Sequence, residues 1–154
     1  MMSKTYFIIA FKESQGILIL KRKMLEKWEL PKFAQSNKKP INEMVDEYIK
    51  NNFKSSHKFI GQSSIVDSYE WPKELQTITG KEGGEHRFIF VEITGKIDKE
   101  KLNKNEYDSY NLVDYDLLVE KVIFKNHKKV LKQVIEDLNK KIGLKGRASE
   151  NSEK

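Results

Sequence analysis

The sequence predicts a single α+β domain built around a β-sheet. Strand-like apolar runs come first, an amphipathic helix follows, more strands come next, and a second amphipathic helix closes the chain. The chain has 154 residues, of which 38% are hydrophobic and 34% charged, so it is long enough to enclose a core and has a globular composition. We expect one domain over residues 1–144. Residues 145–154 lack an apolar anchor and are expected to form a disordered tail.

The first two predicted strands form a hairpin. Residues 6–11 are a continuous apolar run typical of a buried strand, residues 13–16 form a turn, and residues 17–20 return as the second strand. A third short strand over residues 28–30 ends before a proline, which disfavours a helical conformation in the residue that precedes it. Residues 33–40 are predicted to be a polar loop.

An amphipathic helix is predicted after this loop. Its apolar stripe has a period of 3.6 residues. The stripe consists of Ile41, Met44, Val45, Tyr48, Ile49 and Phe53. The opposite face carries polar side chains, among them Glu43, Asp46 and Glu47.

The second half of the chain returns to strands. Short strands are expected at residues 59–60, 65–66 and 68–71, with Gly61 separating the first two, and residues 88–93 are rich in β-forming side chains. Loops are predicted over residues 79–85 and 95–106.

A final strand and two helices are predicted at the C-terminal end. The strand covers residues 111–113, and Asp114 can cap a short helix over residues 115–119. The last helix spans about residues 126–141, and Gly143 fits its C-terminal cap. Its buried stripe is expected to be Val130, Leu131, Val134, Ile135 and Leu138.

Composition excludes several classes of protein. No apolar run reaches the roughly 18 residues of a membrane-spanning helix, and the absence of cysteine excludes disulfides and thiolate zinc sites. The N-terminal apolar run is too short for a signal peptide, so a cytoplasmic protein is the simplest expectation. The net charge of +6 would attract phosphate-bearing ligands, or it reflects a general lysine bias, since the basic residues do not form a clustered stripe.

Several stretches share the order and spacing of motifs in one enzyme family. Residues 28–32 read W-E-L-P-K, which looks like a W-x-hydrophobic-P-K-G entry to a signature box. Residues 69–72 and 83–90 read Y-E-W-P and G-G-E-H-R-F-I-F, similar to Y-x-hydrophobic-P followed by G-G-Q-x-Q-x-W-F-x-F. Residues 106–113 and 122–131 look like a later E-x-x-x-Y-x-W-hydrophobic motif and a closing helix. The sequence thus resembles the Nudix hydrolases of the diadenosine-tetraphosphatase and RNA-pyrophosphohydrolase type.

The resemblance implies a fold, a ligand and a reaction. The fold would be an α/β/α sandwich with a mixed sheet, in which the box forms a loop, a helix and a loop. The ligand would be a nucleoside diphosphate linked to another group, such as a nucleotide, a dinucleoside polyphosphate or an RNA 5′ end. The reaction would be the attack of water on a phosphoanhydride, assisted by Mg²⁺ or Mn²⁺.

The box itself departs from the family pattern, which is Gly, five residues, Glu, seven residues, then Arg-Glu-hydrophobic-x-Glu-Glu-x-Gly. In an alignment without a gap, Phe33 takes the place of the first Gly, and Lys54 takes the place of the last Gly. Lys39 stands at the first Glu, and Glu47 stands at the Arg. The three later Glu become Tyr48, Asn51 and Asn52. A loop shortened by one residue instead places Glu47 on the first Glu of the helix, with Lys50 and Asn51 at the paired positions. Neither register keeps the paired carboxylates that Mg²⁺ prefers as ligands.

The remaining acidic residues offer a displaced site. Glu43, Asp46 and Glu47 could together hold a metal ion, and an active enzyme would use Glu43, Glu47 and Glu106 as its catalytic acids. The plainer interpretation is a solvated helix face on which Asp46 pairs with Lys50.

The resemblance also implies candidates for nucleotide binding. A lysine beside the box can contact a phosphate, the loop before the central strand lies near the phosphates or base, and aromatic rings can stack on a base. The candidates are Lys32, His86, Arg87, Tyr69, Trp71 and Phe124. Each could instead be an ordinary surface or core residue.

Three functions remain open from the sequence. The chain could bind a nucleotide or an RNA 5′ end with little or no turnover, because its box is degenerate. It could be an active metal-dependent pyrophosphohydrolase of the Ap4A type with relocated carboxylates. It could also be a protein-interaction scaffold that keeps only the fold.

Overall fold

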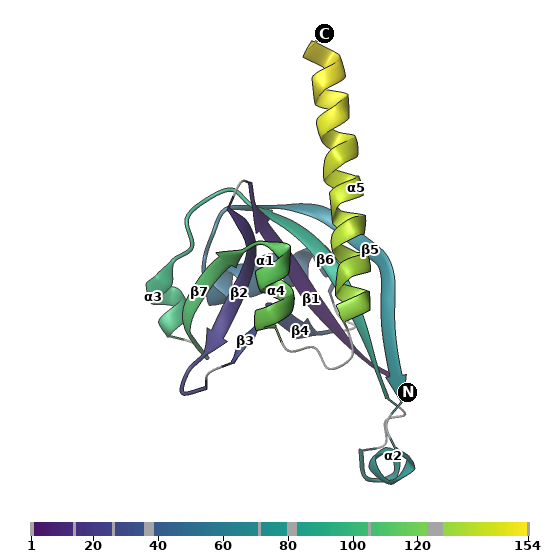
Figure 1. Cartoon of the computed structure of the whole chain (residues 1–154). Helices are drawn as coiled ribbons and strands as arrows, with labels where there is room; N and C mark the ends of the chain where they lie inside the picture. Colours follow the sequence, from purple (N-terminus) through teal and green to yellow (C-terminus); the bar gives the residue numbers. More distant parts are fainter. Residues whose placement is uncertain are drawn as a thin grey trace.

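The computed structural model describes residues 2–13, 15–25, 27–35, 39–70, 72–79, 83–104, 106–122 and 128–153. A mixed β-sheet lies at the centre, with α1 on one face and α4 and α5 on the other (Figure 1). This arrangement confirms the predicted α+β class with a mixed sheet. Within the described ranges, no helix combines the length and the apolarity needed to cross a membrane.

The sheet has seven strands, and its central pair is parallel. The order is β3-β2-β1-β6-β5, while β4 pairs with β1 and β7 pairs with β2. β1 runs parallel to β6, and the other pairings are antiparallel. The strands are β1 (Met2–Lys12), β2 (Gly16–Arg22), β3 (Trp28–Glu29), β4 (Lys32–Ala34), β5 (His57–Glu70), β6 (Gly83–Ile93) and β7 (Tyr107–Val113).

Five helices are described, and they differ in what they bury. The helices are α1 (Ile41–Asn52), α2 (Lys73–Thr79), α3 (Lys99–Asn103), α4 (Tyr115–Lys121) and α5 (Lys128–Glu153). Val45 and Ile49 of α1 are fully buried against one sheet face. Leu131 and Val134 of α5 are buried against the other face.

Two apolar clusters result because side chains alternate along each strand. On β1, Ile8 belongs to the cluster under α1, whereas Phe7 and Ile9 belong to the cluster under α4 and α5. β6 alternates in the same way, with Ile89 on the α1 face and Phe88 on the other. The continuous apolar run of β1 is therefore that of a strand covered on both faces.

Most predicted elements are confirmed. The hairpin of β1 and β2, the helix α1 and the strand β6 form where the sequence indicated them. Asp114 caps α4 as expected, since its Oδ1 accepts a hydrogen bond from the backbone N–H of Leu117 at 2.9 Å. The predicted stripe of α5 is buried or packed against the core.

Several boundaries are wrong in the sequence prediction. Gly61 does not separate two strands, because β5 runs through it with an irregular register against β6. Residues 33 and 34, expected in a loop, pair with β1 as part of β4, and Phe33 lies opposite Tyr6. The helices α2 and α3 were not predicted, and α2 lies at the far end of the β5–β6 hairpin (Figure 1).

The C-terminal segment also differs from the expectation. Gly143 does not end the last helix, because α5 continues to Glu153 through residues that the sequence predicted to be disordered. Figure 1 shows that the distal part of α5 projects beyond the sheet. The proximal part is tied to β5, where Asp137 Oδ2 accepts hydrogen bonds from the Ser63 hydroxyl at 2.6 Å and the Ser64 backbone N–H at 3.3 Å. The domain boundary at residue 144 stays a prediction.

Candidate functional site

A pocket of about 300 Å³ opens beside α1. Its helical residues are spaced by three and four, which places them along one flank of the helix. The lining residues are Phe33 from β4, Lys39, and Met44, Glu47, Tyr48, Asn51 and Asn52 from α1. We call this space the α1 pocket.

The α1 pocket gathers the positions that the alignment without a gap assigns to the box. The positions of its four glutamates are held here by Lys39, Tyr48, Asn51 and Asn52, and all four line the pocket. In the alternative register Lys50 would be one of the paired residues, but Lys50 is exposed and does not line the pocket. The geometry favours the register without a gap.

In the predicted alignment, two charged positions carry the opposite sign to those of the family box. In the register without a gap, Lys39 stands where the box has Glu, and Glu47 stands where it has Arg. The Lys39 ammonium is paired with the Glu47 carboxylate across the pocket. The hydrogen bond and charge of Glu47 raise the pKa of Lys39 above its usual value. The pair is solvent-exposed, so its contribution to stability is small, but it cancels both charges in the pocket.

The residue that ends α1 supports the same register. Lys54 occupies the position of the last Gly of the box, and its φ of 41° lies in the left-handed region that favours glycine. Its backbone N–H donates to the carbonyl of Ile49 at 2.7 Å, closing the helix as a C-terminal glycine does.

Replacing Lys54 with Gly should therefore stabilise the protein. We expect Lys54→Gly to raise the free energy of unfolding by up to about 1 kcal/mol, because glycine adopts positive φ without a steric cost. The matched control is Lys50→Gly, inside α1, which should lower it by about 1 kcal/mol. Urea unfolding measures both values, and a loss of stability in both variants would contradict the assignment.

The three acids of α1 do not converge on one point. Asp46 is turned toward β5, where its Oδ1 lies 2.6 Å from Nε2 of His57. Glu47 is paired with Lys39 instead. In the part of the chain that the structure describes, no group of three or more His, Asp or Glu side chains could hold a metal ion. A metal role for Glu43, Asp46 and Glu47 remains a prediction that this geometry does not support.

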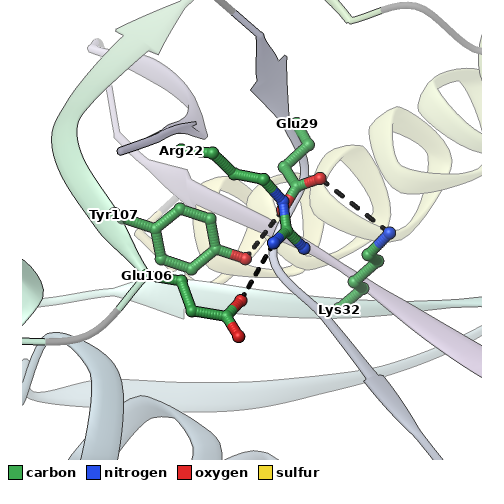
Figure 2. A network of polar contacts seen from close by, with 5 residues as sticks. All are labelled: Arg22, Glu29, Lys32, Glu106 and Tyr107. Carbon is green, nitrogen blue, oxygen red and sulfur yellow. Dashed lines mark hydrogen bonds and ion pairs between the residues drawn. The ribbon is translucent and has the colours of Figure 1, made fainter. Parts of the chain in front are cut away.

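A second polar cluster lies close to the α1 pocket, and we call it the Glu29 network (Figure 2). The Glu29 carboxylate is nearly buried, and its Oε1 accepts from Nε of Arg22 and from the hydroxyl of Tyr107, both at 2.8 Å. Lys32 Nζ lies 3.8 Å from the other carboxylate oxygen. Arg22 also donates from Nη1 to Glu106 at 3.0 Å, and its guanidinium stands 5.7 Å from the centre of the Tyr107 ring.

The Glu29 network shifts the pKa of several groups. Burial alone would lower the pKa of Arg22, but the charges of Glu29 and Glu106 outweigh it and raise that pKa. Burial raises the pKa of Tyr48 to about 12 and also raises the pKa of Tyr107. Both phenols therefore stay protonated at neutral pH and act as neutral groups. Tyr48 borders both the network and the α1 pocket.

The structure places the two candidates at the start of β6 on opposite faces. Arg87 alternates with Ile89, on the α1 face, and its Nε donates to Glu85 at 2.8 Å. That hydrogen bond lowers the pKa of Glu85 and raises that of Arg87. His86 lies on the other face, with its ring 4.9 Å from that of Phe7 and its Nδ1 3.5 Å from Asp67. One ligand group cannot contact both residues from a single face.

The side chains of the three predicted stacking residues lie outside the part of the chain that the structure describes. Trp71 and Phe124 are not among the described residues, and only the backbone of Tyr69 is described, within β5. The aromatic residues that the structure does place in the pocket are Tyr48 of α1 and Phe33, which the sequence analysis assigned to a loop. Phe33 was not among the predicted stacking residues. Its position in the box, where the family has glycine, is the signal that could have drawn attention to it.

Comparisons with solved structures identify the architecture. An Escherichia coli dihydroneopterin triphosphate pyrophosphohydrolase matches with a TM-score of 0.62 and 10% identity, over 86% of this chain and 95% of that one. A Nudix hydrolase from Nitrosomonas europaea matches with a TM-score of 0.63 and 9% identity, over 90% of this chain and 89% of that one. The chain has the Nudix fold. A C. elegans Ap4A hydrolase matches with a TM-score of 0.62 and 8% identity, over 88% of this chain and 97% of that one.

The fold alone does not assign a reaction, and the sequence has no match among protein families or curated proteins. Nudix hydrolases are expected to use Mg²⁺ or Mn²⁺, so the donor set of the α1 pocket can be tested for fit. It offers two amides and an ammonium, whereas the Tyr48 hydroxyl is buried, and its one carboxylate, Glu47, is paired with that ammonium. Divalent magnesium prefers carboxylates and water, so these residues do not fit it.

Proposed function

We propose that this chain uses the Nudix fold to bind a nucleotide, a dinucleoside polyphosphate or an RNA 5′ end with little or no turnover. One observation carries the proposal. The positions of the box that would carry metal-binding carboxylates converge on the α1 pocket, and they hold Lys39, Tyr48, Asn51 and Asn52. Such a degenerate box cannot offset the charge of a divalent ion.

Two of the three acids that would serve an active enzyme are already engaged in ion pairs. Glu47 is paired with Lys39, and Glu106 is paired with Arg22 at 3.0 Å. A metal ion would have to compete with a cationic side chain at both places. This favours the binding function over the alternative, an active Ap4A-type pyrophosphohydrolase that uses Glu43, Glu47 and Glu106.

Two cationic side chains that are each paired with a carboxylate still have exposed surface for a phosphate ligand. Lys32 has 40% of its side chain exposed and borders the Glu29 network. Arg87, on the α1 face, is partly exposed next to Glu85. With a net charge of +6, the chain also attracts polyphosphates from solution. We assign these two residues to phosphate contacts, whereas His86 would contact only a ligand on the opposite face.

Binding without hydrolysis is the expected result of a direct assay. The purified chain is mixed with diadenosine tetraphosphate, nucleoside triphosphates or 5′-triphosphorylated RNA, each with Mg²⁺, Mn²⁺ or EDTA. Because the box lacks its carboxylates, we expect no nucleotide or phosphate release above background. Saturation at about 100 times the dissociation constant should stabilise the fold by about 2.7 kcal/mol, with or without metal.

The Glu47→Gln variant separates the alternatives. If the wild type hydrolyses one of the ligands and Glu47→Gln abolishes this turnover, the proposal is overturned in favour of the active enzyme. If the wild type shows no turnover and no thermal shift with any of the ligands, the protein-interaction scaffold is the function that remains.

A further inference from the structure

The charge balance of the α1 pocket decides what kind of chemical group it suits. Lys39 and Glu47 cancel one another, and Glu43 lies near enough to raise the pKa of Lys39 by its charge. A phosphate would meet carboxylates beside a cation that is already paired, and a metal ion would meet an ammonium. A neutral group suffers neither repulsion.

The volume of the α1 pocket limits the size of the ligand that it can enclose. A volume of about 300 Å³ lies at the lower end of the range for small-molecule sites. It suits one ring system and not a whole dinucleoside polyphosphate. The larger part of such a ligand would extend out of the pocket toward the sheet.

Phe33 lines the pocket from the sheet side, and Tyr48 lines it from α1. Phe33 is stacked on Tyr6, with ring centroids 5.6 Å apart and an angle of 19° between the planes. Tyr48 leans against Phe33 at 6.1 Å and packs on Phe53 at 6.3 Å. Phe33 is therefore held in place by two neighbours while it stays partly exposed in the pocket, so a flat ligand that stacks on its exposed part avoids the cost of fixing a mobile ring.

Amide groups line the pocket from the helix side. Asn51 and Asn52 each carry a donor group and an acceptor group, which match the mixed donors and acceptors along the edge of a nucleobase. The Asn52 side chain is oriented by its own hydrogen bond, which its amide nitrogen donates to the carbonyl of Tyr48 at 2.9 Å. Amides at these positions are poor metal ligands but suitable partners for a base.

We propose that the α1 pocket binds the base of the nucleotide ligand, by stacking on Phe33 and by hydrogen bonding to Asn51 and Asn52. The pocket formed by the box helix thus recognises a ring and does not hold a metal–diphosphate group. This proposal rests on the proposed nucleotide-binding function and specifies where the base lies. The phosphates then extend away from Glu43 and Glu47.

Nucleosides without any phosphate provide the test. Adenosine, guanosine, cytidine and uridine are titrated into the full chain in EDTA by calorimetry, with ribose 5-phosphate as the comparison. We expect at least one nucleoside to bind more tightly than ribose 5-phosphate. If no nucleoside binds up to its solubility limit, the base-pocket proposal is overturned.

Variants assign the binding to this pocket. Phe33→Leu should weaken nucleoside binding by about fivefold to a hundredfold, because stacking on the ring is lost. Phe33→Tyr keeps the ring and should stay within about twofold of the wild type. The matched control is Phe59→Leu, on the exposed surface of β5, which should bind as the wild type does. Equal binding by Phe33→Leu and the wild type would overturn the proposal.

A second variant, at an amide of the pocket, tests the proposal even if Phe33→Leu does not fold. Asn51 is exposed on α1, so Asn51→Ala should keep the fold and weaken nucleoside binding about two- to tenfold. Unchanged affinity in Asn51→Ala together with a folding defect in Phe33→Leu counts against the proposal.

Diadenosine tetraphosphate is titrated in parallel. If it binds equally well to the wild type and Phe33→Leu, the nucleotide-binding function stands and the base pocket fails; if neither it nor a nucleoside binds the wild type, both fail.

Discussion

Replacing Lys39, Asn51 and Asn52 together with Glu is expected to create a Mn²⁺ site in the α1 pocket. The change lowers the net charge by four, by two at position 39, where a positive charge is also removed, and by one at each asparagine position. Position 39 lies across the pocket from Glu47, and the two asparagines line the same space, so the new carboxylates would converge. Hard divalent cations bind where several carboxylate oxygens meet.

Metal-dependent stability measures this gain. Without metal, the variant should be less stable than the wild type, because its carboxylates repel one another and two of them stand near the C-terminal end of α1. At Mn²⁺ concentrations about 100 times the dissociation constant, its melting temperature should rise by roughly 5–10 °C. The wild type should show no comparable rise.

A neutral variant provides the control for this experiment. Replacement of the same three residues with Gln changes the side chains without adding carboxylates, so it should bind no Mn²⁺ detectable by electron paramagnetic resonance. Equal Mn²⁺ binding by the wild type and the Glu variant would refute the claim that the box has lost its metal ligands. Equal Mn²⁺ binding by the Glu and Gln variants would refute the same claim.

Glu29→Ala is expected to be among the most destabilising single substitutions near the site. The side chain of Glu29 is only 9% exposed and accepts hydrogen bonds from Arg22 and Tyr107. Its removal would leave a guanidinium and a buried phenol without their shared acceptor. We expect a loss of about 3 kcal/mol, since Arg22 is partly exposed and can recover some solvation.

The control for Glu29→Ala is an acid that pairs with the same arginine. Glu106 also accepts from Arg22, but its side chain is 71% exposed. Glu106→Ala should therefore cost less than about 1 kcal/mol. Urea unfolding gives both free energies, and similar losses would show that the burial of Glu29 does not set its contribution.

The elements that the sequence predicted well are those with a strong local pattern. The apolar run in β1, the stripe of α1 and the Asp114 cap each depend on neighbouring residues, and each was confirmed. β4 was missed because its three residues become a strand only by pairing with β1. The continuity of β5 through Gly61 likewise depends on β6, which lies beyond the reach of local pattern.

The candidate site shows the same division. The sequence predicted a box without its paired carboxylates, but it left the register of the box open. Only the folded chain places Lys39 against Glu47, and Lys54 at positive φ. The division of His86 and Arg87 between two faces follows from strand alternation once both lie within β6. The Glu29 network joins four strands, β2, β3, β4 and β7, so no linear motif could have revealed it.

The parallel pairing at the centre of the sheet has a consequence for how the chain acquires its structure. Met2 pairs with Gly83 and Phe11 with Glu92, so β1 lies against a strand that is synthesised much later. The two apolar surfaces of β1 must remain incompletely covered on a ribosome until that distant partner emerges. Contacts this far apart in sequence close slowly, because the intervening loop loses entropy before any pairing compensates for it. β1 is thus enclosed well after it has been synthesised, and its apolar surfaces are open to aggregation during that interval.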